Sequence, residues 1–379
     1  MRLAIPSETD ANEARVAATP ETVKKFAALG ASVTVERGAG LKSGIRDADY
    51  EAAGAVIGAD KAAVLKDADL VLSVRRPGAE ALKLVPKGAA LIAIMDPYGH
   101  EAALQAMAGA HVNAFAMELM PRITRAQVMD VLSSQANLAG YRSIIDAAGE
   151  FGRAFPMMMT AAGTVPAAKI FIMGVGVAGL QAIATARRMG AIVTATDVRP
   201  ATKEQVESLG AKFIAVEDDE FKQAETSGGY AKEMSAEYQA KQAALVAAHI
   251  AKQDIVVTTA LIPGRPAPML VSADMVHSMK PGSVIIDLAV ERGGNCALAK
   301  PGETVDAGGV KIVGHLNVAG RLPASASALY ARNLYAFAET LIDKEKKALA
   351  INWDDELVKA TCLTREGAVV HPNFQPKAA

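Results

Sequence analysis

The chain has 379 residues, enough for two domains at roughly 150 residues each. Its 40 Lys and Arg residues against 41 Asp and Glu residues leave a net charge of −1, which argues against nucleic-acid binding through bulk positive charge. Hydrophobic residues make up 51% of the chain and charged residues 21%, which excludes disorder, while the mean hydropathy of +0.18 raises the question of a membrane.

Short apolar runs alternate with helical stretches over the first third of the chain. The runs predict strands at residues 2–5, 32–36, 70–74, 89–95 and 111–116. After the first strand, Thr19 has the position of an N-cap before Pro20, and Gly30 ends the predicted helix. Such a series of βαβ units is typical of a parallel sheet with helices on both faces.

The middle of the chain changes character. The pattern of residues 125–152 predicts an unusually long helix, which we expect to bridge two domains. The segment FPMMMTAAGTVPAA follows, and its Thr, Gly and Pro residues predict an extended hairpin or a linker. Its three consecutive methionines suit either core filling or an adaptable contact between subunits.

A second βαβ series begins at Lys169. Strands are predicted at residues 169–173, 192–196, 212–215, 254–258, 283–287 and 311–313. The polar residues 217–238 predict a mobile loop that enters a helix. Residues 325–347 form an amphipathic helical pattern, and a small hairpin around Glu366 is expected to close the chain.

No segment of the sequence satisfies the requirements of a transmembrane helix, which needs about 20 nearly unbroken apolar residues. The most apolar stretch, residues 170–186, contains three glycines and Gln181 and is flanked by Lys169 and Arg187. The N-terminus lacks the apolar core of a signal peptide. The two cysteines are far apart in sequence, which indicates a reducing compartment without a disulfide framework.

A glycine-rich turn follows the strand predicted at residues 169–173. Residues 174–179, GVGVAG, have the spacing G-x-G-x-x-G between a strand and a helix. In this motif Gly174 permits the tight turn, Gly176 leaves room for a pyrophosphate, and Gly179 lets the helix pack closely on the strand. The N–H groups at the helix N-terminus then bind the phosphates. The pattern predicts a dinucleotide site, although a plain Gly-rich turn is the alternative.

Asp197 ends the next predicted strand, where an acid can bind the 2′- and 3′-hydroxyls of a ribose. A carboxylate there repels a 2′-phosphate, so NAD(H) is favoured over NADP(H). Arg199 keeps the other choice open, because an Arg can accommodate that phosphate. A role of Asp197 as a helix cap is the structural alternative.

The two βαβ series with this motif predict the fold class. We expect an α/β protein with two Rossmann-like doubly wound parallel-sheet domains joined by long helices. The first, discontinuous domain would comprise residues 1–138 and 320–379, and the dinucleotide-binding domain residues 139–319 with its N-terminal hairpin.

A second conspicuous cluster lies in residues 117–135, MELMPRITRAQVMDVLSSQ. Arg122, Gln127, Asp130 and Ser133 are polar groups in an otherwise apolar stretch beside the expected domain cleft. One interpretation is ordinary helix capping with surface charge. The other is a polar loop that holds the nicotinamide carboxamide and its ribose, since a Gln offers an amide both a donor and an acceptor.

These clusters, together with NEARVAATPE and TALIPGRPAP…KPGSVIIDLAVERGGN, resemble the superfamily of alanine dehydrogenase and the NAD(H)-binding component of proton-translocating transhydrogenase. The resemblance covers almost the whole chain. The segments AMELMPRITRAQ, SSQANLAGYR, FPMMMTAAGTVPAAK and GVGVAGLQAIATARRMGA are similar specifically to the transhydrogenase branch.

The transhydrogenase resemblance implies that hydride passes directly from NADH on this chain to NADP⁺ on a separate component, by proximity and orientation of the two rings. It implies that the polar loop around nicotinamide and its ribose consists of Arg122, Gln127, Asp130 and Ser133, with Gln127 contacting both nucleotides. It assigns Gly174, Val175, Gly176 and Val177 to the pyrophosphate, beside the packing glycine Gly179. The remaining implied contacts are Asp197, Val198 and Arg199 at the adenosine ribose, Gly229 and Tyr230 in a closing loop, Met234 behind it, and Gln242 and Leu261.

An alanine-dehydrogenase-like amino-acid oxidoreductase is the alternative function. Oxidation of an amino acid requires a proton acceptor and cationic groups. By the same resemblance, the catalytic Lys and His of alanine dehydrogenase are replaced here by Ser73 and Met95, and a catalytic Asp becomes Glu291. Arg15 alone is kept, so this chemistry is disfavoured. A non-enzymatic NAD(H)-binding or sensing subunit is a third hypothesis.

The resemblance also implies partners. The chain is expected to be a homodimer that docks on a membrane-spanning transhydrogenase subunit and an NADP(H)-binding subunit, with the Met-rich hairpin as an intersubunit element. We expect no nucleic-acid partner and no membrane span in this chain, and a cytoplasmic location with peripheral attachment to the inner membrane. The six histidines show no ligand spacing, so no metal site is predicted.

Overall fold

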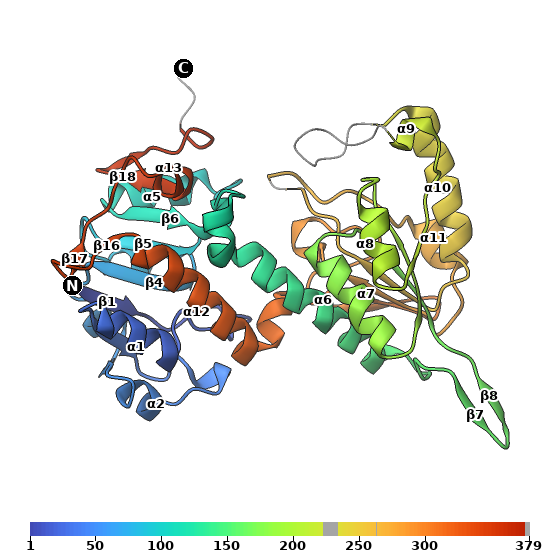
Figure 1. The fold of residues 1–379 in the computed structure, drawn as a ribbon, viewed down its shortest axis with the longest axis horizontal. Helices are drawn as coiled ribbons and strands as arrows, with labels where there is room; N and C mark the ends of the chain where they lie inside the picture. Colours follow the sequence, from blue (N-terminus) through green and yellow to red (C-terminus); the bar gives the residue numbers. More distant parts are fainter. Residues whose placement is uncertain (223–233, 263, 376–379) are drawn as a thin grey trace. The chain divides into compact units, whose positions relative to one another are not determined.

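The computed structural model describes residues 1–222, 234–262 and 264–375, and the chain divides into two compact units (Figure 1). The first unit comprises Met1–Gln135 and Gly320–Ala379, and the second comprises Ala136–Ala319. The chain passes from the first unit to the second within helix α6 (Val131–Glu150). Both units are α/β with a doubly wound sheet, as the sequence predicts.

The first unit is built on an eight-stranded sheet with the order β19-β18-β6-β5-β4-β1-β2-β3. Its strands are β1 (Arg2–Ile5), β2 (Ser32–Glu36), β3 (Val56–Gly58), β4 (Leu70–Arg75), β5 (Ala90–Ile94), β6 (Asn113–Ala116), β18 (Cys362–Arg365) and β19 (Ala368–Val369). The run from β3 to β6 is parallel, and at one edge β18 pairs antiparallel with β6 and β19 pairs antiparallel with β18. The parallel strands therefore have the order 3-2-1-4-5-6 of a doubly wound fold.

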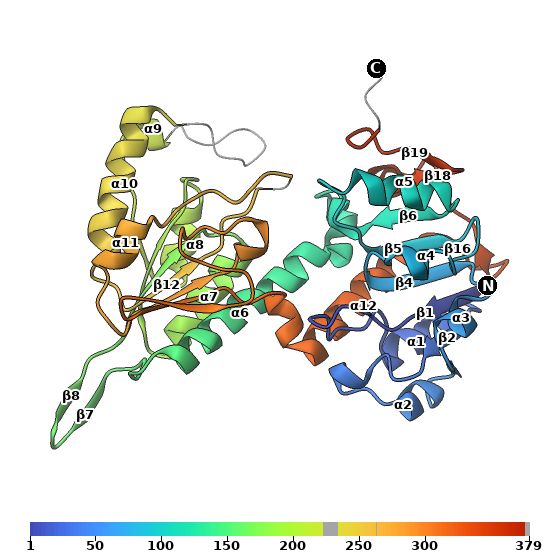
Figure 2. The ribbon, with the colours of Figure 1, turned by 180° about the vertical axis from the view of Figure 1, so that it is seen from behind.

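Helices cover both faces of this sheet (Figures 1 and 2). They are α1 (Pro20–Ala28), α2 (Asp47–Glu51), α3 (Lys61–Leu65), α4 (Ala79–Leu82), α5 (Glu101–Gly109), α12 (Pro323–Glu339) and α13 (Glu356–Thr361). One core contains Phe26 of α1 and Phe337 of α12, and the other contains Leu65 of α3 and Leu104 of α5. Successive strand residues alternate between the two cores, as the pleat requires.

Two helical predictions in this unit need correction. The helix expected at residues 325–347 ends with α12 at Glu339 and is followed by a small hairpin, β16 (Ile342–Asp343) and β17 (Ala348–Leu349). Asp343 Oδ1 accepts hydrogen bonds from the N–H groups of Glu345 and Lys346, and this local turn replaces the helix. The helix expected from residue 125 begins only at Val131, because Asp130 caps it there, and a 3₁₀ helix, η3 (Thr124–Met129), precedes it.

The second unit contains a seven-stranded sheet with the order β11-β10-β9-β12-β13-β15-β14. Its strands are β9 (Lys169–Met173), β10 (Ile192–Thr196), β11 (Lys212–Phe213), β12 (Ile255–Thr258), β13 (Val284–Asp287), β14 (Thr304–Ala307) and β15 (Val310–Val313). All pairs are parallel except β14 with β15. The six parallel strands again have the order 3-2-1-4-5-6, counted from β9 and leaving out the antiparallel β14.

The central strands of this sheet, β9, β12 and β13, are buried on both faces because helices pack on each side. The helices are α7 (Val177–Arg188), α8 (Thr202–Ser208), α9 (Asp219–Lys222), α10 (Ala236–Ile250) and α11 (Ala273–Ser278). Ile170 and Ile172 of β9 contribute to one core, and Phe171 and Met173 to the other. The Met-rich segment forms the predicted hairpin, β7 (Met158–Thr160) with β8 (Gly163–Val165).

Two further observations bear on the sequence predictions. Of the helices in the described residues, none is long and apolar enough to cross a membrane. Within the same residues, no group of three or more His, Cys, Asp or Glu side chains is arranged to hold a metal ion.

Candidate dinucleotide-binding site

The strand order of the second unit marks the carboxyl ends of β9 and β12 as the expected ligand-binding edge of the sheet. The order reverses between these two neighbouring strands, because β10 follows β9 on one side and β13 follows β12 on the other. Doubly wound sheets bind their ligands at this switch point. The loops after β9 and β12 are therefore the first candidates for ligand contacts.

The glycines at 174, 176 and 179 lie in the loop after β9 and in the first turn of α7, and each has different steric surroundings. Gly174 has φ +103°, and a Cβ there would lie 2.5 Å from Thr259 Oγ1. A Cβ on Gly179 would lie 1.9 Å from the Gly174 carbonyl oxygen, so only glycine lets α7 approach β9 this closely. A Cβ on Gly176 would meet nothing within 4 Å. Gly174 and Gly179 are thus required by the fold, whereas Gly176 faces open space.

The start of α7 is suited to an anion. Gly176 occupies the N-cap and provides no side-chain hydrogen bond to the helix. The N–H groups of a helix's first turn have no partners within the helix, and the helix dipole adds positive potential there. A phosphate seated over Gly176 would contact these N–H groups.

Asp197 follows β10 and is bound to this turn. Its Oδ2 accepts from the Val175 N–H at 2.7 Å and from Arg199 Nη2 at 3.0 Å, and its Oδ1 accepts from the Arg199 backbone N and Nε, both at 2.9 Å. The Asp197 side chain is 8% exposed and that of Arg199 32%. Both carboxylate oxygens of Asp197 therefore accept two hydrogen bonds each, and the guanidinium of Arg199 is paired with this carboxylate.

The loop after β12, which contains the predicted contact Leu261, lies against the same turn through contacts that the sequence analysis missed. Thr259 Oγ1 donates to the Gly174 carbonyl oxygen at 2.9 Å. The neighbouring Ala260 is hydrogen-bonded to the side chain of Asn295. No local pattern indicates these contacts, because they join residues that are far apart in sequence.

The polar cluster predicted around the nicotinamide belongs to the first unit. Asp130 Oδ1 accepts from the Ser133 N–H at 2.9 Å and its Oδ2 accepts from Ser133 Oγ at 2.5 Å, so this pair caps α6. Gln127 lies exposed in η3, and Arg122 lies exposed just before it. The first unit thus presents an amide and a guanidinium on a segment fixed by the cap.

The other predicted contact residues differ in their surroundings. Val175 is buried, whereas Val177, Val198 and Leu261 are 41%, 54% and 52% exposed. Met234 packs against the core of the second unit. Gln242 accepts from the Val216 N–H at 2.9 Å and donates to Thr196 Oγ1 at 3.2 Å. Gly229 and Tyr230 lie outside the described residues.

The two positions that the resemblance aligns with the catalytic Lys and His of alanine dehydrogenase carry no side chain that accepts a proton near neutral pH. Ser73 is 4% exposed and Met95 is fully buried in the apolar core. Arg15 is buried, and its guanidinium donates twice to Glu13, at 2.7 Å each, and once to Gln135 at 2.8 Å. Glu291 is exposed and accepts from the Asn317 N–H at 3.1 Å.

The ion pairs around Glu13 fix its protonation state. Burial alone would raise the pKa of Glu13, but the hydrogen bonds and charges of Arg15 and Arg75 outweigh it and lower this pKa to about 2. Nearby, Glu8 accepts from the Val74 N–H at 2.7 Å, and burial raises its pKa to about 7 against that hydrogen bond. The first unit therefore holds one strongly ionised carboxylate beside one that protonates near neutral pH.

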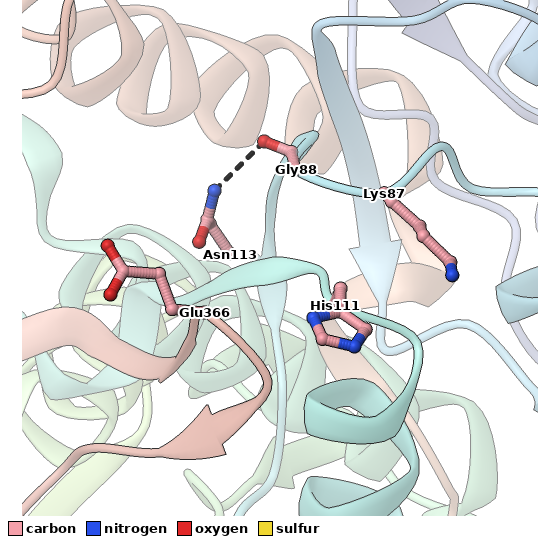
Figure 3. Close-up of a pocket in the computed structure, with 5 residues that line it drawn as sticks. All are labelled: Lys87, Gly88, His111, Asn113 and Glu366. Atoms are coloured by element: carbon pink, nitrogen blue, oxygen red, sulfur yellow. Dashed lines mark hydrogen bonds between the residues drawn. The ribbon is translucent and has the colours of Figure 1, made fainter.

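An open hollow in the first unit is lined by Lys87, Gly88, His111, Asn113 and Glu366 (Figure 3). Gly88 precedes β5 and Asn113 is the first residue of β6, so the hollow lies at the amino ends of these strands. Asn113 Nδ2 donates to the Gly88 carbonyl oxygen at 2.9 Å. Because doubly wound sheets bind ligands at the opposite edge, we do not assign the dinucleotide here.

Comparison with known proteins agrees with this geometry. Residues 4–139 match the family model "Alanine dehydrogenase/PNT, N-terminal domain", and residues 143–372 match "Alanine dehydrogenase/PNT, C-terminal domain". The chain is 56% identical to a protein of Rhodospirillum rubrum named as the first part of NAD(P) transhydrogenase subunit alpha, over 100% of both chains. It is 44% identical to the protein of the same name from Rickettsia prowazekii, over 98% of this chain and 96% of that one.

The solved structures include a close neighbour. The crystal structure of transhydrogenase from Sinorhizobium meliloti has 64% sequence identity and a TM-score of 0.90, covering 98% of this chain and 100% of that chain. Matches to both domain models and to full-length relatives cover the first and second units alike. The chain therefore belongs to the alanine dehydrogenase/PNT family, within its NAD(P) transhydrogenase alpha subunits.

Proposed function

We propose that this chain is the NAD(H)-binding subunit of a proton-translocating transhydrogenase, and that hydride passes directly from NADH bound here to NADP⁺ on a separate subunit. Membership of the family implies binding of a nicotinamide nucleotide. The observation that carries the proposal is the pairing of an open phosphate-binding turn at Gly176 with an acid at Asp197, on a chain whose relatives are named transhydrogenase subunits.

The choice of NAD(H) over NADP(H) rests on Asp197 and Arg199. A 2′-phosphate beside Asp197 would meet a carboxylate, which repels it. Arg199 is the cation that could bind such a phosphate, but its guanidinium is paired with Asp197. A ribose with free hydroxyls avoids the repulsion and can take over acceptor positions on the carboxylate.

Direct hydride transfer requires no general acid or base on this chain, because NADH itself supplies the hydride. The residues of the chain have to bind, orient and exclude water. Buried Ser73 and Met95 provide no proton acceptor where amino-acid oxidation would need one. We therefore assign Gln127, Arg122, Asp130 and Ser133 to orientation of the nicotinamide and its ribose.

The remaining contacts follow the turn and its surroundings. We assign the pyrophosphate to the turn of residues 174–177, with Gly179 behind it, and the adenosine ribose to Asp197, Val198 and Arg199. Weaker assignments are Gly229, Tyr230, Met234, Gln242 and Leu261.

The partners of the chain follow from the names of its relatives. Relatives named as one portion of an alpha subunit imply further subunits in the same enzyme. We propose that this chain forms a homodimer, works at the cytoplasmic face of the inner membrane, and docks there on a membrane-spanning subunit and an NADP(H)-binding subunit. The membrane subunit would couple hydride transfer to proton movement.

Mixing the purified chain with the NADP(H)-binding subunit tests this function. NADH should reduce a spectroscopically distinct NADP⁺ analogue, such as thio-NADP⁺, only when both proteins are present. Failure of a competent partner to support transfer would leave only a binding or sensing role. Rapid NADH oxidation by the chain alone with pyruvate and ammonia would instead establish alanine-dehydrogenase chemistry.

A further inference from the structure

We propose that Asn295 is a positioning residue for the dinucleotide: it holds residues 259–261 against the glycine turn, and this placement supports the nicotinamide half of NAD(H) but not the adenosine half. The inference rests on the proposed function, since it concerns the same nucleotide. None of the sequence patterns singles out Asn295 for this role.

The side chain of Asn295 binds the backbone of Ala260, in the loop after β12, through both of its polar atoms. Its Oδ1 accepts from the Ala260 N–H at 3.0 Å, and its Nδ2 donates to the Ala260 carbonyl oxygen at 2.9 Å. Nδ2 also donates to the Pro268 carbonyl oxygen at 2.7 Å. Asn295 is fully buried, so these bonds are made away from water, where leaving a partner unsatisfied is costly.

The loop fixed in this way lies directly against the phosphate-binding turn. Thr259, the neighbour of Ala260, donates through Oγ1 to the Gly174 carbonyl oxygen at 2.9 Å. A Cβ placed on Gly174 would lie 2.5 Å from Thr259 Oγ1 and 3.3 Å from the Ala260 nitrogen. The loops after β9 and β12 are thus in van der Waals contact at the switch point of the sheet.

Asn295 is itself held by a buried carboxylate. Asp287, the last residue of β13, is fully buried and accepts from the backbone N–H groups of Asn295 at 2.8 Å, Cys296 at 3.0 Å and Ala289 at 2.9 Å. It also accepts from Thr258 Oγ1 at 3.1 Å. These bonds connect the ends of β12 and β13 with Asn295, so its hold on Ala260 is anchored in the sheet.

The strand order indicates which half of the nucleotide depends on this hold. A doubly wound sheet consists of two mononucleotide-binding halves. The half with β9, β10 and β11 carries the glycine turn and Asp197, which serve the pyrophosphate and the adenosine ribose. The half with β12, β13 and β15 is left for the nicotinamide mononucleotide, and the loop at Ala260 is the element of that half nearest to Gly174.

The test compares NADH with 5′-AMP, which contains only the adenosine half. Asn295→Leu keeps the branching and the number of heavy atoms of the side chain and removes its three hydrogen bonds. We expect the Kd for NADH to rise about 10-fold or more, as for the loss of buried hydrogen bonds, while the Kd for 5′-AMP stays within about twofold. A role confined to general stability would not change the ratio of these two constants.

Gln253→Leu is the matched control. Gln253 is also a buried amide, 4% exposed, but it precedes β12 at the opposite edge of the sheet, where its Nε2 donates to the His249 carbonyl oxygen at 3.1 Å. This variant should lower the melting temperature without changing either Kd. Asn295→Asp, which keeps the acceptor but loses both donated bonds, provides the same comparison should Asn295→Leu fail to fold.

The outcomes separate the two proposals. If the wild type binds NADH and the Asn295 variants bind it equally well, only the positioning role is overturned. The same conclusion follows if the variants lose affinity for NADH and 5′-AMP in parallel. Wild-type protein that does not bind NADH would overturn the proposed function, and the role of Asn295 with it. A selective loss of NADH affinity in the Asn295 variants, absent from Gln253→Leu, supports both.

Discussion

Adding one methyl group at Gly176 or at Gly179 should have opposite consequences, although the two glycines belong to one motif. A Cβ on Gly176 meets nothing within 4 Å, and the residue has φ −83° and ψ −166°, which alanine tolerates. Gly176→Ala should therefore leave the free energy of unfolding unchanged or raise it by about 0.4–1 kcal/mol, since alanine restricts the unfolded chain. The substitution should instead lower the affinity for the ligand.

The binding loss follows from the space that the methyl group takes. A pyrophosphate displaced from the start of α7 would lose one or more hydrogen bonds to a charged group, worth about 1.5–3 kcal/mol each. The Kd for NADH should accordingly rise about 10- to 100-fold. Titration of NADH fluorescence, combined with urea unfolding of the free protein, measures both quantities in the same samples.

Gly179→Ala provides the comparison. Its Cβ would lie 1.9 Å from the Gly174 carbonyl oxygen, so α7 must move away from β9. Such overpacking typically costs about 1–3 kcal/mol, and we expect at least this loss of stability. If Gly176→Ala binds NADH as tightly as the wild type does, the phosphates are not bound over this residue. If Gly176→Ala is less stable than the wild type, the space around Gly176 is not open as described.

Three further predictions concern charge and position. Asp197→Asn removes the carboxylate from the proposed ribose site and releases Arg199 from its ion pair. NADH should then bind about 10-fold more weakly, and NADPH should bind more tightly. An unchanged preference between the two nucleotides in competition titrations would contradict the NAD(H) assignment. Glu8 protonates more readily in the folded state, with a pKa of about 7 against 4.5, so its stabilising contribution is complete below pH 4.5 and is lost as the pH rises through 7. Glu8→Gln still accepts the hydrogen bond from the Val74 N–H. In urea unfolding it should be as stable as the wild type at pH 4, and more stable than the wild type at pH 8 by about 3 kcal/mol at most. Equal stability of the two proteins at pH 8 would argue against the raised pKa of Glu8. Gln127→Asn should lower the rate of hydride transfer much more than the affinity for NADH, whereas equal losses would argue against a positioning role.

Many strands of the two large sheets could be predicted because the central strands are buried on both faces. Such strands appear as continuous apolar runs, and the predicted bounds of β1 and β9 agree with those observed. The predicted bounds of β2 and β10, which alternate between buried and more exposed residues, agree as well. The short edge strand β3 was missed, since Val56 is 60% exposed and three residues carry little pattern. The end of α12 was misplaced because the turn at Asp343 depends on one side chain binding nearby N–H groups.

The glycine turn and Asp197 could be found in the sequence because their roles depend on local backbone geometry. The contact of Thr259 with Gly174 joins residues 85 positions apart, and that of Asn295 with Ala260 joins residues 35 apart. No local spacing encodes these pairs. They exist only because the sheet brings the ends of β9, β12 and β13 together, so they required the tertiary structure.

The most direct test of the account follows the hydrogen itself. NADH carrying deuterium on the transferred position of C4 would be mixed with this chain, the NADP(H)-binding subunit and NADP⁺ in ordinary water, and the product would be analysed by mass spectrometry. Direct transfer predicts that the NADPH contains the deuterium in full. NADPH that contains hydrogen from water, or that forms equally without this chain, would contradict the central claim.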